Sequence, residues 1–472
     1  MNTVIADMIH LSKNLEVEIY LVGGMIRDLL LNRVSKDLDL VVIDHHRAFA
    51  EKAAEKLQGT FVELDRERET YRVVLKNGII LDFSKIRGKT IEEDLYERDF
   101  TINAMAYNLK EGWPLEEEKV IDPFNGREGL HSKKIRHLQG KAFQEDPLRM
   151  LRAVRFMSQL EFELEEETKE LIRSHRNGIT TVAGERIAEE LFKILNEKKT
   201  HHYFSIMDKE LKLLEKIFPE VREMKEVGEC KYHLLDSWNH SIYTMKVVES
   251  YIYAEGFFED HIREAYEVHC DEIVAGNHSR LQLLKLGALF HDVGKPSAQR
   301  VDDTGRVRFK GHEITGAEII KEYGNKLKLS LKEKEILYKY IFLHMWPLEL
   351  YKKNDVSGKT LYTLFQKTGK ETLEILLIAL ADIVATRRIL DPQEEMGMFK
   401  VHIEYIANNY LTRYRPIEEI SSMIKGEEIM ALLDIPEGKK VGEVLEDIKK
   451  AIYFGEIAPN KEAVIQYLKK VY

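Results

Sequence analysis

The chain has 472 residues, of which 44% are hydrophobic and 32% are charged. These proportions exclude general disorder and allow three to four domains, each with its own core. The formal net charge of −10 argues against a protein that coats nucleic acid, so any contact with phosphate must depend on local clusters of Lys and Arg.

Two further features of the sequence concern the compartment. The most apolar run, residues 373–385, is interrupted by Glu374 and Asp382 and is too short to span a bilayer, and no signal peptide opens the sequence. Cys230 and Cys270 provide no disulfide framework, which fits a reducing compartment. We therefore expect a soluble cytoplasmic protein with no membrane partner.

The first part of the chain has the pattern of an α/β domain. Short β-branched runs predict four strands, at 19–22, 38–43, 71–75 and 79–83. Asn77-Gly78 joins the last two as a hairpin signal. From about Gly140 apolar residues recur at helical spacing, and Asp146-Pro147 predicts a helix with Pro at its first position. We expect an α/β head followed by mainly helical domains.

A glycine pair and two aspartates in the head predict a site for metal and triphosphate. Gly23 and Gly24 end the first predicted strand, where a backbone without side chains approaches a phosphate closely, and Arg27 follows one helical turn later to meet its charge. In the next strand, alternation places the carboxylates of Asp37 and Asp39 on one face. Adjacent like charges are costly without a cation, and hard oxygen ligands suit Mg²⁺.

Two such ions can activate an attacking hydroxyl and stabilise a leaving pyrophosphate. Asp82, in the fourth predicted strand, adds a third carboxylate to the predicted catalytic set.

Ordered motifs relate this head to a known family. The segment 23–28 with Asp37-Leu38-Asp39 resembles the signature of the DNA polymerase β-type nucleotidyltransferase superfamily. Four later segments resemble motifs of class II tRNA nucleotidyltransferases and bacterial poly(A) polymerases: 98–104, 122–126, 145–149 and 184–187. The resemblance implies that Arg98, Asp99 and Asn103 contact the nucleotide. Glu97 stands where that family usually has a second arginine, so Arg98 is the arginine of that pair that remains available to contact the nucleotide.

The segment 145–149 matches the element that selects the nucleotide in this family. On a helix, residues three apart share a face, so Asp146 and Arg149 would present an acceptor beside a donor. Cytosine and adenine both offer an amino group beside a ring-nitrogen acceptor, whereas uracil and guanine offer the reverse order. The pair is therefore expected to accept C or A without a nucleic-acid template. Arg152 and Arg155, in phase on the same helix, are expected to meet phosphate.

A second series of metal-binding residue types follows in the middle of the chain: His240, His291, Asp292, His312, His344 and Asp382. This series resembles the HD phosphohydrolase superfamily, and the resemblance implies one or two divalent metals of unknown identity that generate a hydroxide for phosphoester cleavage.

The segment 253–280 is acidic and lacks a clean period, so it is expected to form an inserted loop. Its residues His269, Cys270 and His278 are expected at the surface.

With the resemblance, the chain divides into four domains. These are a nucleotidyltransferase head (1–138), a neck with the nucleotide-selection helices (139–222), an HD domain (223–390) and a helical RNA-binding tail (391–472). The implied partners are the tRNA 3′ end, CTP and ATP.

The spacing between Asp82 and Arg98 bears on the product. CCA-adding enzymes of class II usually carry a flexible loop there, and here the connection is short, as in CC-adding members that leave the final A to a separate A-adding enzyme. We rank CC addition first, CCA addition second and poly(A) synthesis third. A different class of function stays open, in which the head is a regulatory nucleotide-binding module and the HD domain is the enzyme. The clustered Asp37, Asp39 and Arg98 argue against an inactive head.

Overall fold

The computed structural model describes residues 1–472 apart from 67–68, 228–234, 252–253, 255, 388–392 and 419–423. Cys230 therefore lies outside the described residues. The chain forms two compact units, the first made of residues 1–182 with 206–216 and the second of 183–205 with 217–472. The four domain boundaries expected from the sequence stay predictions.

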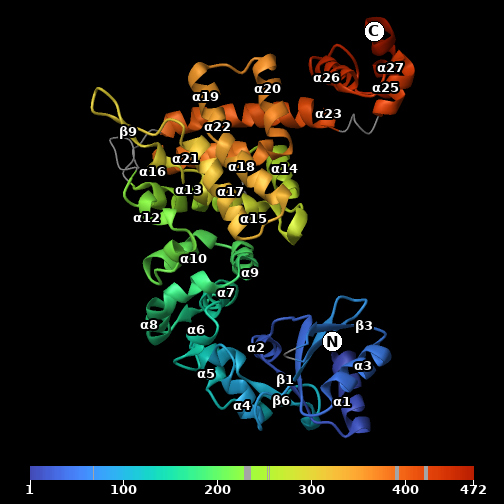
Figure 1. The fold of residues 1–472 in the computed structure, drawn as a ribbon, viewed down its shortest axis with the longest axis vertical. Coiled ribbons are helices and arrows are strands. Elements are labelled where there is room, and N and C mark those ends of the chain that lie inside the picture. Colours follow the sequence, from blue (N-terminus) through green and yellow to red (C-terminus); the bar gives the residue numbers. More distant parts are fainter. Residues whose placement is uncertain (67–68, 228–234, 252–253, 255, 388–392, 419–423) are drawn as a thin grey trace. The chain divides into compact units, whose positions relative to one another are not determined.

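A six-stranded mixed sheet forms the centre of the first unit (Figure 1). Its strands are β1 (Ile19–Val22), β2 (Asp37–Val42), β3 (Thr60–Asp65), β4 (Thr70–Val74), β5 (Ile80–Lys85) and β6 (Ala106–Asn108). Their order is β3-β4-β5-β2-β1-β6, and β2 and β5 run parallel while the other neighbours are antiparallel. The predicted α/β head is confirmed, including the hairpin of β4 and β5, whereas β3 and β6 were not anticipated.

Alternation along β2 directs its side chains to opposite sides of the sheet. Leu38 and Leu40 are 1% exposed, whereas Asp37 is exposed and Asp39 is partly exposed. On the apolar side, α3 (His46–Leu57) packs on the sheet through Phe49, whose ring lies 5.8 Å from that of Phe83 on β5. Helix α1 (Asn2–Leu15) packs against α3. Asp37 and Asp39 lie on the opposite side of the sheet, which also carries the buried Val41.

Short helices complete the first unit: α2 (Gly24–Leu30), α4 (Ile91–Tyr96), α5 (Gly126–Ser132), α6 (Ala142–Glu145), α7 (Arg149–Leu160) and α8 (Glu166–His175). The helix expected to open at Asp146-Pro147 begins instead at Arg149, with Asp146 in extended conformation before it. Oδ1 of Asp146 accepts the N–H of Leu148 at 3.2 Å. This side-chain turn competes with helical backbone geometry, which explains the later start.

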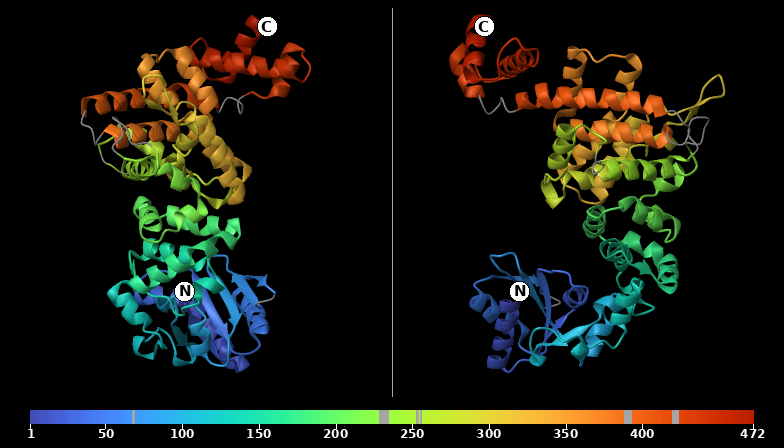
Figure 2. Two further views of the ribbon diagram at one scale, coloured as in Figure 1. Left: turned by 60° about the vertical axis from the view of Figure 1, so that its left-hand side comes forward. Right: turned by 180° about the vertical axis from the view of Figure 1, so that it is seen from behind.

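The second unit is helical (Figure 2). Its core is built from α13 (Ser237–Tyr251), α15 (Arg280–Phe290), α17 (His312–Lys326), α18 (Leu331–Leu343) and α21 (Thr372–Arg387). Helix α21 contacts α13, α15 and α18, and almost every described side chain between Leu373 and Ala385 is buried. The apolar run noted in the sequence is thus the central helix of this core. No described helix is both long enough and apolar enough to cross a membrane.

The acidic segment before α15 is not the inserted surface loop that its composition suggested. It contains helix α14 (Asp260–Cys270), which buries Ile262, Tyr266 and Cys270 at i, i+4 and i+8. His269 is 5% exposed, and burial raises the pKa of the Cys270 thiol. The expectation of surface residues was therefore wrong for His269 and Cys270, while the partly buried His278 stacks on Phe192 with ring centroids 3.5 Å apart.

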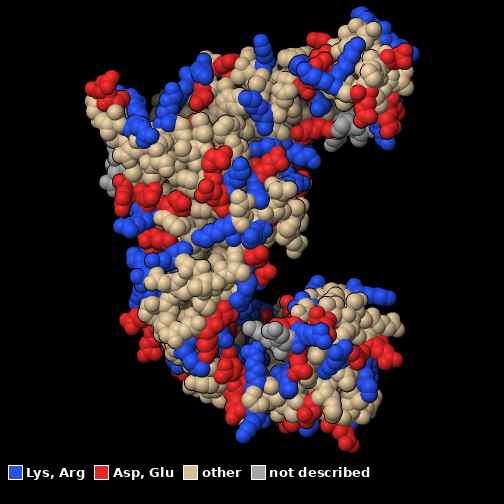
Figure 3. All heavy atoms as spheres, viewed as in Figure 1, with Lys and Arg blue, Asp and Glu red and all other residues tan. Residues whose placement is uncertain are grey.

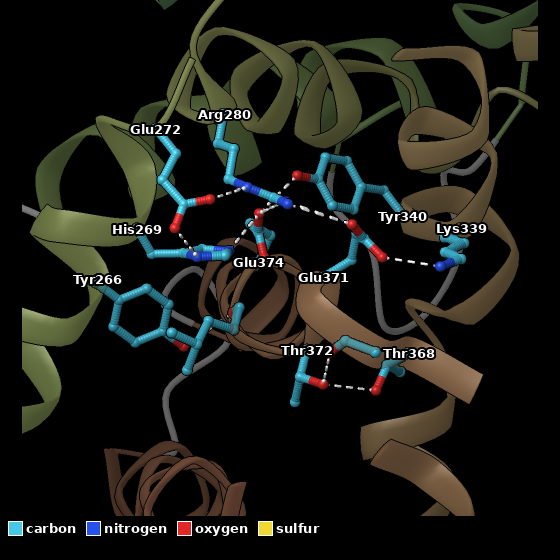
Figure 4. Close-up of polar contacts among 12 residues, drawn as sticks. Tyr266, His269, Glu272, Arg280, Lys339, Tyr340, Thr368, Glu371, Thr372 and Glu374 are labelled. Carbon is cyan, nitrogen blue, oxygen red and sulfur yellow. Dashed lines mark hydrogen bonds and ion pairs between the residues drawn. The ribbon is translucent and has the colours of Figure 1, made fainter. Parts of the chain in front are cut away.

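Buried ion pairs explain why the composition of this segment suggested a surface loop (Figure 4). His269 Nε2 and Arg280 Nη1 both lie 2.8 Å from Oε1 of Glu374, a residue with no exposed surface, and Tyr340 donates to the same oxygen at 3.0 Å. Arg280 also contacts Glu272 at 3.0 Å. Charged residues thus occupy core positions, which hides the apolar period on which helix recognition depends.

The C-terminal part holds α22 (Gln393–Asn409), α25 (Gly426–Leu433), α26 (Lys439–Tyr453) and α27 (Lys461–Val471). Tyr410 and Tyr414 are 3% and 8% exposed and pack around Phe365, so these tyrosines belong to the core. On the face of the second unit that Figure 3 presents, basic and acidic side chains are interspersed.

Candidate active and metal sites

Three side chains form a row across the exposed face of the head sheet. Parallel pairing of β2 with β5 places Asp39 opposite Asp82, and antiparallel pairing of β5 with β4 places Asp82 opposite Arg72. Arg72 donates from Nε to Oδ1 of Asp82 at 2.7 Å and from Nη2 to Oδ2 at 2.8 Å. Arg72 was not predicted as a site residue, although it lies in the predicted strand that neighbours the strand of Asp82.

The electrostatics of this row favour a cation. Burial raises the pKa of Asp39, and the nearby carboxylates of Asp82 and Asp37 raise it further, while Arg98 only partly offsets them. A divalent ion would relieve that repulsion, since carboxylate oxygens are the ligands that Mg²⁺ prefers. Asp37 and Asp39 therefore fit the expected metal, and Asp82 lies beside them with both oxygens held by Arg72.

Gly23 leaves space that a side chain would fill. Its φ is +71°, and a Cβ at this position would lie 2.7 Å from Nη1 of Arg98 and 3.3 Å from Oδ2 of Asp39. The N–H of Gly23 donates to the carbonyl of Met105 at 3.1 Å. In this structure the glycine thus serves mainly by lacking a side chain, which brings Arg98 against the turn before α2, where Gly24 begins the helix.

A buried polar chain connects most of the predicted nucleotide contacts. Arg27 donates to Asp28 at 2.9 Å and to Asn103 at 2.8 Å. Asn103 donates to Asp99 at 2.9 Å, and Arg152 meets the other oxygen of Asp99 with two N–H groups. Burial alone would raise the pKa of Asp99, but Arg152 and these hydrogen bonds hold it below its ordinary value. The motif 98–104 and the helix α7 are thereby joined into one rigid site.

The arginines of this region surround one aromatic ring. The guanidinium carbons of Arg27, Arg152 and Arg155 lie 5.2, 5.5 and 4.1 Å from the ring centroid of Phe156. Cation–π attraction to the Phe156 ring holds the three guanidinium groups close together despite their mutual repulsion. Such a cluster is suited to bind polyphosphate.

The predicted base-reading pair sits where α6 gives way to α7. Asp146 precedes α7 and Arg149 is its first residue. The guanidinium of Arg149 donates to the backbone carbonyls of Glu97 at 2.9 Å and Ala142 at 3.5 Å. These bonds fix the plane of the guanidinium, and Arg149 is partly exposed. The structure brings Arg149 against Glu97, the residue that precedes the motif 98–104.

The predicted HD residues converge in the second unit into two groups of three. His240, His291 and Asp382 form one group, and Asp292, His312 and His344 form the other, with the ligand atoms of each group within 4.8 Å of one another. His240 Nε2 lies 3.0 Å from Oδ1 of Asp382, and His312 Nε2 lies 3.2 Å from Oδ1 of Asp292. Five of the six residues are buried, and Asp382 is partly buried.

Helix ends position these ligands. His291 and Asp292 directly follow α15, His344 directly follows α18 and His312 is the first residue of α17. The Nδ1 atoms of His291, His312 and His344 lie 2.6–2.9 Å from backbone carbonyls three residues earlier. Those carbonyls set each tautomer so that Nε2 is free to coordinate, a usual arrangement for metal-binding histidines.

The side-chain nitrogen and oxygen atoms of this centre are better suited to coordinate a cation than to hydrogen-bond to each other. Nε2 of His291 and Oδ2 of Asp292 are buried and 3.3 Å apart, and Nζ of Lys295 lies 2.5 Å from the same oxygen of Asp292. Burial disfavours protonation of His291, but Asp292 and Asp382 outweigh it and raise its pKa to about 10. Without a metal, a proton would supply the positive charge that this centre demands. One or two divalent ions fit the two groups.

Three known domain families match parts of this chain. Residues 19–136 match the poly(A) polymerase head domain, 161–225 match the probable RNA- and SrmB-binding site of polymerase A, and 237–387 match the HD domain. The A-adding tRNA nucleotidyltransferase of Deinococcus radiodurans is 29% identical over 94% of this chain and 93% of its own length. The CC-adding enzyme of Thermus thermophilus is 28% identical over 94% and 91%.

A solved structure has the same fold. The Thermotoga maritima CCA-adding enzyme complexed with tRNA superposes with a TM-score of 0.60 at 24% identity, covering 99% of this chain and 94% of that one.

A mixed sheet with three aspartates on one face and a glycine turn beside them defines a nucleotidyltransferase head, here followed by a helical HD domain. The chain belongs to the family of class II tRNA nucleotidyltransferases and bacterial poly(A) polymerases that carry an HD domain. Its relatives include enzymes that add CC, A or CCA to tRNA.

Proposed function

We propose that this protein adds two cytidines from CTP to the 3′ end of tRNA and then stops. The observation that carries this proposal is the short connection between β5 and α4. There the N–H of Arg87 donates to Asp94 at 3.0 Å, the N–H of Lys89 donates to Glu93 at 2.6 Å and Thr90 caps α4. A segment held by its own helix has little freedom to remodel the pocket for a final adenosine.

The residues of the head divide the chemistry among them. The 3′-oxygen of the tRNA forms a bond to the α-phosphorus of CTP, the bond to the β-phosphate breaks and pyrophosphate leaves. Asp37 and Asp39 would hold divalent ions, which when bound activate the attacking hydroxyl and neutralise charge on the phosphates. Arg98 and the arginines around Phe156 would hold the triphosphate. Asp82, oriented by Arg72, would accept the proton from the 3′-hydroxyl.

Base choice would fall to Asp146 and Arg149. Asp146 would accept the exocyclic amino group of cytosine, and Arg149 would donate to the neighbouring ring nitrogen. Because the carbonyls of Glu97 and Ala142 hold Arg149, the guanidinium keeps one orientation and discriminates between bases by hydrogen-bond order. Adenine offers the same order, so a stop after two cytidines must come from the fixed pocket shape.

The test is mass analysis of products. A tRNA transcript that lacks its last three nucleotides is incubated with CTP and ATP, and we expect a mass gain of two cytidines only. A terminal A at low enzyme concentration would establish CCA addition, and a long A tail from ATP alone would establish poly(A) synthesis. A transcript that already ends in CC serves as a control, because its extension by one A, with no cytidine added to the first transcript, would establish an A-adding enzyme.

A second activity is favoured by the two groups of metal-ligand residues in the HD domain. We propose that this centre hydrolyses a phosphoester: the oxygen of water bonds to phosphorus, the ester P–O bond breaks and the proton goes to the leaving oxygen. Metal-dependent release of p-nitrophenolate from bis(p-nitrophenyl) phosphate tests it, with Asp292→Asn as the control. If no divalent metal supports release above the level of that variant, the HD domain has no such hydrolase activity.

A further inference from the structure

The HD centre has an exposed basic ribbon at its rim. Strands β9 (Arg300–Val301) and β10 (Val307–Arg308) form a two-stranded antiparallel ribbon between α16 (Lys295–Ala298) and α17 (Figure 1). Residues 299–311 contain four basic side chains and two acidic ones, on a chain whose formal net charge is −10. The ribbon is therefore positively charged on a chain that is negatively charged overall.

Both ends of the ribbon are attached to residues of the metal centre. After β10, the carbonyl of Phe309 accepts the backbone N–H of His312 at 3.1 Å and lies 2.9 Å from its Nδ1. Before β9, Lys295 lies 2.5 Å from Oδ2 of Asp292, and its Nζ is 5.7 Å from the centroid of the Phe309 ring. Whatever binds to the base of the ribbon is thus within reach of His312 and Asp292.

The arginines of the ribbon share one face. In the register of the two strands Arg300 is directly opposite Arg308, and Val301 is opposite Val307. Alternation places Arg300, Arg306 and Arg308 on one side and the valines on the other. Like charges directly opposite each other destabilise a ribbon, and these arginines are exposed. The arrangement costs stability in the free protein and becomes favourable when a polyanion lies across it.

The acidic residues of the ribbon do not cancel this charge. Asp302 is engaged by the turn itself, because its Oδ1 accepts the N–H groups of Thr304 and Arg306 at 2.9 and 3.0 Å and its Oδ2 meets Arg308. Asp303 is exposed at the tip. The side chains of Arg306 and Lys310 make no hydrogen bond or ion pair with any described residue. The turn is thus rigid, while two cations remain available.

We propose that the ribbon β9–β10 binds the sugar-phosphate backbone of an RNA and presents its terminal phosphoester to the HD centre. Basic side chains would meet successive phosphates. The HD substrate would then be a phosphoester at an RNA end instead of a free nucleotide. This inference rests on the proposed phosphohydrolase function of the HD domain.

The experiment uses the full chain and two substrates with the same scissile bond. One is a short RNA with a p-nitrophenyl ester on its 3′-phosphate, and the other is uridine 3′-(p-nitrophenyl phosphate). The test variant is Arg300→Gln/Arg306→Gln/Arg308→Gln. The control variant, Lys321→Gln/Lys332→Gln/Lys352→Gln, removes the same charge from exposed positions on α17, α18 and α19 (Trp346–Lys353).

We expect the test variant to lower kcat/KM for the RNA ester by about tenfold or more, mainly through KM, because phosphate contacts are lost. The slope of log(kcat/KM) against log[salt] should also fall by about 0.7 for each lost contact. The mononucleotide ester should be hydrolysed within about twofold of the wild-type rate, and the control variant should resemble the wild type on both substrates. Equal loss on both substrates, or no loss on the RNA, would overturn the proposal.

A second measurement separates the ribbon from the hydrolase activity. A 4-thiouridine RNA is cross-linked to the wild-type chain with light, and the modified peptides are mapped by mass spectrometry. Cross-links within 299–311 are expected even if no metal supports hydrolysis, an outcome that would remove the phosphohydrolase function and keep the RNA site. Absence of cross-links there, with cross-links elsewhere on the chain, would remove the RNA site.

Discussion

Arg72 and Asp82 face each other across β4 and β5 and are joined by two parallel hydrogen bonds of 2.7 and 2.8 Å. Such bidentate pairs are strong and directional. Asp82 is in register with Asp39, so the arginine sets the orientation of a carboxylate beside the predicted metal ligands.

We expect Arg72→Met to lower kcat for nucleotide addition by about tenfold to a hundredfold, the scale of a mispositioned general base. KM for CTP should change little, because Arg72 acts through Asp82. In a double-mutant cycle, Asp82→Asn should therefore cost almost nothing further in the Arg72→Met background. Arg47→Met, which removes an exposed arginine of the same head, is the control. Additive losses would mean that Arg72 acts independently of Asp82.

Asp39→Asn should abolish nucleotide addition without lowering stability. The raised pKa of Asp39 means that its ionised form destabilises the folded head above the ordinary pKa of 3.8. Removing that charge in EDTA should leave Tm unchanged or higher, whereas Mg²⁺ should stabilise only the wild type. Thermal unfolding with and without Mg²⁺ measures this, with Asp7→Asn as the control. A variant that retains addition would exclude Asp39 as a metal ligand.

Asp146→Ala should relax discrimination against UTP by about tenfold to a hundredfold, because a hydrogen bond to a charged acceptor contributes about 1.5–3 kcal/mol. The measurement is the ratio of kcat/KM for CTP to that for UTP. Since Asp146 also accepts the N–H of Leu148, Asp146→Asn is the matched control that preserves the turn. Unchanged selectivity in the alanine variant would place base recognition elsewhere.

His291→Ala should remove metal-dependent hydrolysis by the HD domain and spare nucleotide addition. The reason is that His291 belongs to one of the two ligand groups and is fully buried, so water from the solvent cannot replace the metal ligand that is lost. Both reactions are measured on the same preparation. His261→Ala, half-exposed on α14, is the control. A parallel fall in addition by a folded variant would reveal coupling between the two reactions.

Glu374→Gln should destabilise the second unit by about 3–5 kcal/mol, because it leaves Arg280 and His269 buried without their common partner. Urea unfolding measures it against Glu335→Gln, an exposed carboxylate on α18. The pH dependence has a defined sign. Burial alone would raise the pKa of Glu374, but His269 and Arg280 outweigh it and lower the pKa below 4.5, so its contribution is present above pH 4.5 and is lost as the pH falls below that value. Equal stability of the variant and wild type at pH 7 would contradict this.

The sequence alone determined the features that depend on local spacing. Alternation in β2 placed Asp37 and Asp39 on one face, and Asn77-Gly78 predicted the hairpin of β4 and β5. These inferences succeed because strand and helix periods relate residues that are close along the chain.

Only the tertiary structure decided which distant side chains meet. The bidentate pair of Asp82 with Arg72, the ion pair of Asp99 with Arg152 and the burial of His269 against Glu374 depend on how strands register and helices pack. The division of the HD ligands into two groups has the same origin. A charged residue looks the same in a sequence whether solvent or a buried partner balances its charge. Its partner is set by the packing of segments far apart along the chain, and local periodicity does not encode that packing.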